Sequence, residues 1–309
     1  MRIFILIGLA FSGLLAFGQQ KQVCFTFDDL PIVSYGIKDT VYQKKLVEKL
    51  VSSLNENKVP AIGFVNEGGL YVNDTIDLFK IRLLKTWANA GLDLGNHTFS
   101  HPDYNSTSFK EYSLDILKGE TITKEILKKQ GKPLTYFRHP FLHAGNSKLK
   151  ADSLTEFLVS RGYKVAPVTI DNDDYLFALA YKRSSDKKDT RLKLQIGRDY
   201  VDYMERKLTY YENQANRLFG RPINQILLLH ASSLNSDFTE SLISMFKKNN
   251  YTFINMNKAI EDPVFKTNIT VYGKWGISWL DRWALSQGKK GDFFKDEPTT
   301  PDYIVNLAK

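Results

Sequence analysis

Short runs of β-branched and aromatic residues alternate with helical patterns along most of the chain, and this alternation restricts the fold more than any other feature. We predict strands near residues 23–27, 61–65, 92–95, 135–137, 164–168, 226–229 and 252–254. Apolar residues recur at helical spacing over residues 41–55, 77–90, 109–130, 153–161 and 238–248. The predicted class is therefore α/β, a deformed, incomplete (β/α) barrel of about seven parallel strands with outer helices. A doubly wound open sheet is the alternative.

Two segments interrupt this alternation. Residues 178–222 are long, charged and helical around 199–219, which indicates an insertion packed against the barrel. Residues 267–309 are irregular and carry three of the four tryptophans, so we expect them to wrap the domain as a tail. The sequence contains no internal repeat and no low-complexity linker. Residues 19–309 are therefore predicted to form one catalytic domain.

The N-terminal residues 1–18 are predicted to be a signal peptide. Arg2 supplies a positive start, residues 3–17 are apolar, and Ala16-Phe17-Gly18 places small residues where a signal peptidase would cleave, before Gln19. An apolar run of about 15 residues is short for a bilayer core of ~30 Å, which favours cleavage over an uncleaved membrane anchor. We expect an exported protein, periplasmic or extracellular, without stable membrane insertion after cleavage.

Charge and cysteine content exclude several classes of site. The net charge is +8, but the lysines are spread over the predicted helices, as on a solvated face. No basic and aromatic platform indicates binding to nucleic acid, and no protein partner is implied. Cys24 is the single cysteine, so a disulfide framework and four-cysteine zinc sites are excluded. It lies in an apolar run and is expected to be a buried, inert strand residue.

Two adjacent carboxylates, Asp28 and Asp29, follow the first predicted strand. An acidic turn that caps a helix is the ordinary explanation for such a pair. In a parallel barrel, however, the C-terminal ends of the strands form the mouth where catalysis takes place. Successive residues of an extended chain point to different sides, so the two carboxylates could have different roles.

All five histidines follow predicted strands. His97 and His101 are four positions apart, and on a helical turn this spacing would direct both imidazoles to one side, as in zinc sites. The other three are His139, His143 and His230. A lone histidine at a strand end is ordinarily structural, and the H-x-x-x-H spacing alone is a weak indication. The shared location at strand ends favours a catalytic zinc site of one carboxylate and two imidazoles, with an open position for water.

Five short motifs follow one another between residues 26 and 230. They are Thr26-Phe27-Asp28-Asp29, His97-Thr98-Phe99-Ser100-His101, Arg138-His139-Pro140-Phe141, the acidic segment from Asp171 to Tyr175, and Leu228-Leu229-His230. Each is short and permissive, but in this order the set resembles the polysaccharide deacetylases, carbohydrate esterase family 4, with their nodulation-protein-B homology domain. The fold implied by this resemblance, an incomplete (β/α) barrel, agrees with the strand count.

The resemblance implies a metal site and a base. Asp29, His97 and His101 would bind the metal, usually Zn²⁺, with another divalent transition metal such as Co²⁺ as an alternative. Asp28 would be the general base that deprotonates the metal-bound water. Arg138 would pair with Asp28 and keep it ionised and oriented.

The resemblance also implies an acid and a sugar groove. His230 would protonate the leaving amine, with Asp174 as its charge partner. Phe141 and Tyr175 would be substrate-binding walls, and the Phe141 amide could help to hold the oxyanion. Tyr175 stands where the family commonly has Trp, which would make that wall narrower or more polar. For His139 we expect a supporting hydrogen bond rather than a catalytic role.

The predicted function is a metal-dependent hydrolase that removes N-acetyl groups from an acetylated sugar or polysaccharide by attack of zinc-bound water. The same machinery on O-acetyl esters, or on small cyclic amides, is an alternative. A non-catalytic carbohydrate-binding relative would be expected to lack the base, the acid or metal ligands. A two-carboxylate glycosidase would need neither the histidine pair nor a metal. Chitin oligomers, peptidoglycan, poly-N-acetylglucosamine and acetylated xylan all fit as the acetylated glycan.

Overall fold

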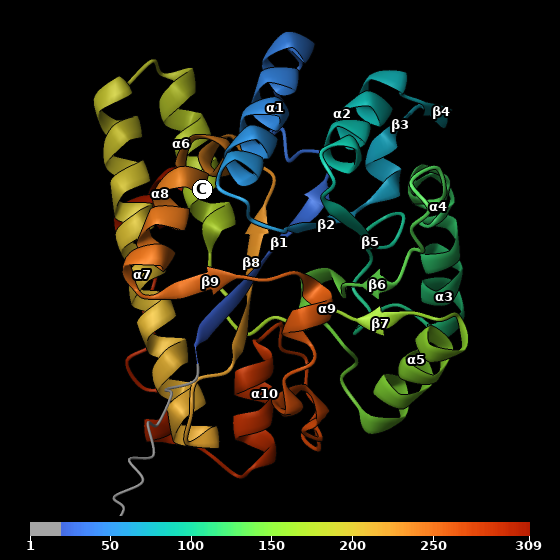
Figure 1. The fold of residues 1–309 in the computed structure, drawn as a ribbon, viewed down its shortest axis with the longest axis vertical. Coiled ribbons are helices and arrows are strands. Elements are labelled where there is room, and N and C mark those ends of the chain that lie inside the picture. The colour runs from blue at the N-terminus through green and yellow to red at the C-terminus, as the bar shows by residue number, and fades with distance from the viewer. Residues whose placement is uncertain (1–19) are drawn as a thin grey trace, which may run out of the picture.

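The computed structural model describes residues 20–309, and the predicted signal peptide lies outside them. Its centre is a parallel sheet with the strand order β7-β6-β5-β2-β1-β8, in which β9 also pairs with β1 (Figure 1). The strands are β1 (Lys21–Leu30), β2 (Ile62–Val65), β5 (Asp93–Asn96), β6 (Tyr136–Phe137), β7 (Lys164–Val165), β8 (Asn224–His230) and β9 (Tyr251–Phe253). An isolated parallel bridge from Ile170 to Leu227 connects the segment after β7 to β8. The sheet therefore curls into a deformed, incomplete barrel, and the predicted fold class is confirmed.

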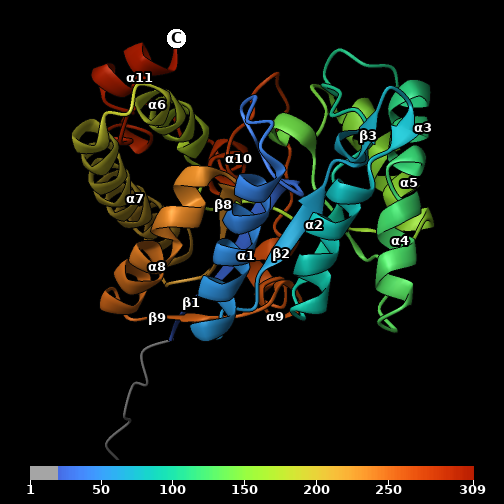
Figure 2. The same ribbon diagram turned by 90° about the horizontal axis from the view of Figure 1, so that it is seen from above.

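Helices cover the outside of this sheet. Figure 2 shows α6, α7 and α8 on one side of the barrel, α3, α4 and α5 on the opposite side, and α1 and α2 between the two groups. The helices are α1 (Thr40–Glu56), α2 (Leu78–Asn89), α3 (Phe109–Lys118), α4 (Thr121–Lys128), α5 (Lys148–Ser160), α6 (Asp174–Asp186), α7 (Thr190–Phe219), α8 (Ser233–Lys248), α9 (Met256–Ala259), α10 (Trp279–Ser286) and α11 (Asp302–Ala308). Short 3-10 turns lie at Glu67–Leu70, Pro140–Leu142, Pro263–Lys266 and Gly291–Phe293, and β3 (Tyr71–Val72) and β4 (Thr75–Ile76) form a separate hairpin.

Side-chain capping determines where several helices begin. Ser108 and Glu111 form a capping box at the start of α3, so the predicted start at residue 109 is confirmed. The helix predicted over 109–130 is in fact two helices, because the chain breaks at Gly119 between α3 and α4. The helices predicted from 153 and 238 begin earlier, where Ser147 and Ser232 accept backbone N–H groups.

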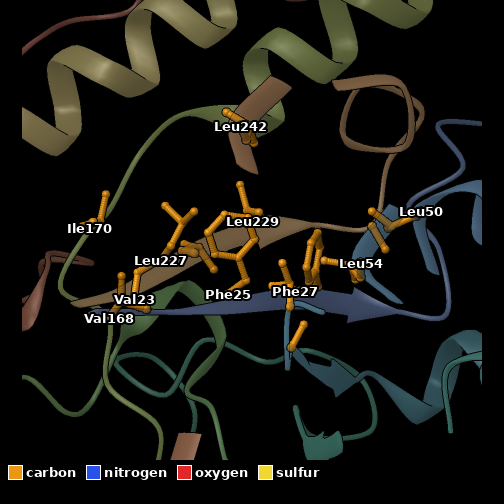
Figure 3. Close-up of a cluster of buried hydrophobic side chains, with 14 of the residues drawn as sticks. Val23, Phe25, Phe27, Leu50, Leu54, Val168, Ile170, Leu227, Leu229 and Leu242 are labelled. Carbon is orange, nitrogen blue, oxygen red and sulfur yellow. The ribbon is translucent and has the colours of Figure 1, made fainter. Parts of the chain in front are cut away.

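The alternation of side chains along β1 explains how the core and the barrel mouth are built. Phe25 and Phe27 pack outward against helices, together with Leu50 of α1 and Leu242 of α8 (Figure 3). Cys24 belongs to a second cluster with Ile62, Phe64, Tyr136 and Ile226, and it is buried and free, as predicted. Residues two apart on a strand share a face, so Thr26 and Asp28 follow Cys24 into the barrel, and Asp28 reaches its mouth.

The insertion lies on one side of the barrel, and helices of the tail pack against it. The predicted insertion corresponds to most of α6 and to the 30-residue helix α7, which packs against α6 and α8. In the tail, α10 packs against α7 and α11 packs against α6, with Trp279 and Trp283 buried. No helix within residues 20–309 combines the length and apolar character needed to cross a membrane.

Candidate active site

The loops at the C-terminal ends of the strands enclose a cavity of about 630 Å³. Seven of the predicted site residues line it: Asp28, Asp29, His97, His101, Phe141, Tyr175 and His230. The other two, Arg138 and Asp174, are fully buried and contact lining residues from behind. The fold thus brings together all nine residues that the sequence singled out.

Asp29, His97 and His101 form a cluster whose ligand atoms lie within 4.8 Å of one another. Asp29 Oδ1 is 3.7 Å from His97 Nε2 and 3.6 Å from His101 Nε2. His97 Nδ1 lies 2.9 Å from the Arg138 carbonyl oxygen and donates to it, which leaves the Nε2 lone pair directed at the cluster. Burial and the neighbouring His97 lower the pKa of His101 to about 4, so this imidazole is neutral, as a ligand must be. The donor set fits a divalent transition metal.

The two histidines converge through a loop. The sequence spacing would direct both rings to one side on a helical turn, but the chain forms no helical turn here. After β5, Thr98 has a φ of 68° and His101 a φ of 56°, both in the left-handed region. Asn96 Oδ1 accepts the Thr98 amide hydrogen at 2.7 Å, and Thr98 Oγ1 accepts that of His101 at 3.1 Å. These local bonds turn the chain so that His101 faces back towards His97.

Three residues from other segments hold this loop in place. The Asp115 carboxylate accepts the amide hydrogens of Phe99 and Ser100 at 2.8 and 2.9 Å. The Gly68 amide donates to the Phe99 carbonyl oxygen at 2.8 Å. A Cβ atom at Gly68 would lie 2.4 Å from that oxygen, and one at Gly119 would lie 2.4 Å from the Thr98 carbonyl carbon. Both glycines are therefore required by close approach of the loop backbone.

Arg138 and Asp28 form a pair inside the barrel mouth. Arg138 Nη1 is 3.3 Å from each Asp28 carboxylate oxygen. Its Nε donates to the Ala166 carbonyl oxygen at 2.8 Å and its Nη2 to Thr26 Oγ1 at 3.1 Å. Burial lowers the pKa of Arg138, and the Asp28 charge opposes that shift, so the guanidinium stays protonated. Asp28 Oδ2 lies 3.8 Å from His97 Nε2, next to the cluster.

His230 and Asp174 form a second pair at the mouth. Asp174 Oδ1 accepts from His230 Nδ1 at 2.6 Å, and Oδ2 accepts from the His230 amide at 2.8 Å and from Asn235 Nδ2 at 2.7 Å. Burial alone would lower the pKa of His230, but the charge and hydrogen bond of Asp174 raise it to about 10. At neutral pH this residue is therefore an imidazolium. His230 donates its Nδ1 hydrogen to Asp174, which leaves Nε2–H as a proton donor.

The remaining predicted residues form walls or supports. Phe141 and Tyr175 are 53% and 48% exposed, large apolar surface at a cavity rim, and the Phe141 ring lies 4.5 Å from that of His101. His139 does not line the cavity: its ring stacks on Trp279 at 6.4 Å. The hydrogen bond expected for His139 is missing at Nδ1, which has no partner among residues 20–309.

Sequence reasoning missed several residues of the site. Tyr35 lines the cavity and donates from its hydroxyl to the Tyr175 carbonyl oxygen at 3.2 Å. Gly276 brings the C-terminal tail into the same lining. Asn172 supports the loop between Asp171 and Asp174 by donating to the Leu228 carbonyl oxygen at 2.7 Å. Tyr35 and Gly276 lie in no motif, and Asn172 lies inside the fourth motif without a predicted role, because these roles depend on contacts distant in sequence.

The known proteins to which this chain is similar include polysaccharide deacetylases. Residues 18–159 match the sequence model of the polysaccharide deacetylase family. A peptidoglycan-N-acetylglucosamine deacetylase of Bacillus cereus is 28% identical over 150 residues, which cover 48% of this chain and 46% of that protein, or about half the length of each. The resemblance predicted from the motifs is confirmed. The segment that matches the family model, residues 18–159, contains Asp28, Asp29, His97, His101 and Arg138. Asp174 and His230 lie beyond it.

Two solved structures share the fold with a TM-score of 0.50. One is a mutant of a peptidoglycan deacetylase from Bacillus subtilis, 18% identical, with 79% of this chain and 91% of that chain covered. The other is a mutant of a family 4 carbohydrate esterase pseudoenzyme from Bacillus anthracis, with restored enzymatic activity. It is 16% identical, and 78% of this chain and 68% of that chain are covered. At these identities the likeness concerns the fold.

Adjacent glycines provide a test of the loop that carries the histidines. Gly68→Ala should weaken zinc binding on the order of tenfold, because its Cβ would displace the Phe99 carbonyl between the two histidines. Gly69→Ala is the matched control, since a Cβ there meets nothing within 4 Å. Competition with a chromophoric chelator measures both affinities. Equal affinities for the two variants would show that the loop is not held at Gly68.

Proposed function

We propose that this protein is a metal-dependent deacetylase that hydrolyses the N-acetyl groups of an acetylated sugar or polysaccharide. One observation carries the proposal: a metal-ligand cluster, a carboxylate paired with arginine, and a protonated histidine face one cavity. Peptidoglycan N-acetylglucosamine, the substrate in the name of the Bacillus cereus relative, is the first glycan to test. With cleavage before Gln19, the enzyme would act outside the cytoplasm.

Asp29, His97 and His101 would hold the cation, with Zn²⁺ as the proposed ion and Co²⁺ as the alternative. When bound, such a cation supplies Lewis acidity, which makes water a nucleophile near neutral pH and polarises the acetyl carbonyl. The cavity lining keeps the three side chains accessible from the substrate side.

Asp28 would accept the proton of the attacking water. Its carboxylate lies beside the cluster, 3.8 Å from His97 Nε2, and the Arg138 guanidinium holds it from the other side. A fully buried guanidinium needs an anionic partner, so this pair favours an ionised Asp28 ready to act as a base. The Phe141 amide, on the wall next to His101, would donate to the developing oxyanion.

His230 would protonate the leaving amine from Nε2, while Asp174 fixes the ring through Nδ1. An amine leaves readily only once it is protonated, so a histidine kept in its acid form favours amide substrates over O-acetyl esters. Phe141 and Tyr175 would flank the sugar ring with their exposed aromatic faces.

The presence of all these groups also favours an enzyme over a binding relative. One fold neighbour is described as a pseudoenzyme, so this fold is not by itself an indication of activity. A non-catalytic relative would be expected to lack the base, the acid or a ligand. Here the base Asp28, the acid His230 and the three ligands converge on the cavity.

Removal of metal should abolish activity. Incubation with a chelator followed by desalting is expected to stop acetate release from N-acetylated glycans, and added Zn²⁺ should restore it. The reason is that the cation held by Asp29, His97 and His101 would activate the attacking water. Acetate release is measured with a coupled enzymatic assay. Full activity in excess chelator would instead support a mechanism based on carboxylates alone.

Substitution separates the base from the metal ligands. Asp28→Asn should retain zinc but lose roughly 100-fold to 10,000-fold in kcat, because the amide cannot accept the proton. His101→Ala should lose zinc. Metal content by mass spectrometry and acetate release are measured together, with Asp186→Asn, a surface change on α6, as the control. A wild-type rate for Asp28→Asn would refute its assignment as the base.

The pH profile tests the acid. His230 stays protonated up to about pH 10 because Asp174 outweighs the effect of burial. In Asp174→Asn the largest influence that raises the pKa of His230 is removed, and only the charges of Asp29 and Asp28 still oppose the effect of burial. The pKa of His230 should therefore fall, and the alkaline limb of kcat/KM should move to lower pH. Asp173→Asn is the control, since its carboxylate accepts from Thr300 and Tyr203 rather than from His230. An unshifted alkaline limb in Asp174→Asn would exclude His230 as the acid.

A further inference from the structure

The turn that carries Phe141 leaves one amide hydrogen without a partner. The Leu142 amide donates to the His139 carbonyl oxygen at 3.1 Å. The His143 amide donates to the Pro140 carbonyl oxygen at 3.0 Å. The Phe141 amide makes no hydrogen bond within residues 20–309, and Phe141 lines the cavity. Its N–H is therefore the group of this turn that remains for the developing oxyanion.

This turn has a backbone conformation that its own residues do not favour. Phe141 and Leu142 have φ values of 56° and 55°, in the left-handed region that residues with bulky side chains rarely adopt. Such a conformation persists only where the surrounding structure maintains it, and it is common at functional sites. The direction of the Phe141 N–H therefore depends on contacts that come from outside the turn.

The C-terminal tail supplies these contacts. Arg282 Nη2 donates to the Leu142 carbonyl oxygen at 2.7 Å and to the Trp275 carbonyl oxygen at 3.1 Å. One guanidinium group thus joins the turn to the tail. A Cβ atom at Gly276 would lie 2.1 Å from the Phe141 carbonyl oxygen, so the tail backbone packs directly on it. The two carbonyl groups that follow the Phe141 amide are both held by the tail.

The helix α10 also contacts the residue that precedes the turn. The Trp279 ring stacks on the His139 ring, with centroids 6.4 Å apart and an angle of 23° between the planes. The Arg282 guanidinium lies over the same indole, with Cζ 5.2 Å from its centroid. The His139 carbonyl oxygen in turn accepts the Leu142 amide hydrogen. Two side chains of α10 therefore contact the turn at both of its ends.

The rest of the fold fixes α10 in its place. The Trp279 amide donates to the Val168 carbonyl oxygen at 2.7 Å, which attaches the start of α10 to the segment after β7. Asp281 Oδ1 accepts from Gln214 Nε2 of α7 at 3.1 Å, which attaches it to the insertion. The turn is thus supported from the barrel and from the insertion through one short helix, as a preorganised group requires.

The charge of Arg282 argues against a purely stabilising contact. Arg282 is 2% exposed, and burial lowers its pKa to about 10, so it remains a cation at neutral pH. Among the described residues no carboxylate lies within ion-pair distance of it, and Asp281 and Asp171 act on it only through longer-range charge. A buried cation without an ion-pair partner lowers stability. A role in orienting the turn accounts for its presence.

We propose that Arg282 is a positioning residue that holds the Phe141 amide in the direction of the oxyanion. It acts through the Leu142 carbonyl oxygen and does not line the cavity, so it contacts neither the substrate nor the cation. The inference rests on the proposed deacetylase function and deepens it, because it gives the C-terminal tail a part in stabilising the transition state. Arg282 takes no part in the proton transfers.

Kinetics of Arg282 variants provide the test. Arg282→Met retains an unbranched side chain but donates no hydrogen bond, and it should lower kcat for N-acetylglucosamine oligomers by about tenfold to 100-fold, with KM and zinc content near wild type. Arg282→Lys should recover part of the loss, since its ammonium can still donate to the Leu142 carbonyl. The matched control is Arg183→Met, because Arg183 also donates to a tail carbonyl, that of Leu307 at 2.9 Å, outside the cavity lining.

A transition-state analogue separates positioning from a general loosening of the site. A methylphosphonamidate in place of the acetamide of N-acetylglucosamine carries a tetrahedral centre with a negative oxygen, whereas the product glucosamine carries none. In Arg282→Met, inhibition by the analogue should weaken by the same factor as kcat/KM falls, and inhibition by glucosamine should stay unchanged. An equal loss for both inhibitors, or a loss for neither, overturns the inference.

A second variant covers the case in which Arg282→Met does not fold, as judged by its melting temperature. Gly276→Ala removes no buried charge, but its Cβ would displace the Phe141 carbonyl, so kcat should fall and the analogue should bind more weakly. A wild-type kcat for Gly276→Ala would count against the inference alone. If the wild-type enzyme releases no acetate from any N-acetylated glycan, the proposed function and this inference are both wrong.

Discussion

The buried guanidinium of Arg138 is the interaction on which the rest of the site depends. It joins Asp28, the proposed base, and the Thr26 hydroxyl on β1 to the Ala166 carbonyl beyond β7, across the inside of the barrel. The Arg138 carbonyl oxygen also fixes the ring of His97. One residue thus connects three strand ends. The buried guanidinium charge would be costly without a partner, and it acquires one only when the barrel closes. The same ion pair is therefore needed both to stabilise the closed barrel and to position the proposed base.

Strand periodicity was sufficient to predict the framework. Apolar runs identified each strand of the main sheet near its observed position, but not the β3–β4 hairpin. Parallel strands carry their C-terminal residues to one end of the barrel. Asp28 could be assigned to that end because it directly follows the first predicted strand, and in the structure it continues the inward alternation of Cys24 and Thr26. The same reasoning placed His97 and His230, which also follow buried strands.

The loops could not be predicted in the same way. The spacing of His97 and His101 suggested a helical turn, but left-handed Thr98 and His101 bring the rings together instead. That conformation depends on Gly68 and Asp115, which lie in other segments. Local sequence patterns determine which backbone conformation is favourable for isolated segments, whereas these loops are shaped by close tertiary contacts. Tyr35, Gly276 and the supporting role of Asn172 were not predicted for the same reason.

The tail has a consequence for the order in which the site is assembled. Gly276 and Arg282 support the loop of Phe141 and Leu142, yet they follow every proposed catalytic residue in the chain. The proposed ligands, base and acid are therefore synthesised before the segment that holds the proposed substrate wall in its strained form. The conformation of the Phe141 and Leu142 wall therefore depends on a segment near the C-terminus, although the wall itself lies in the middle of the chain.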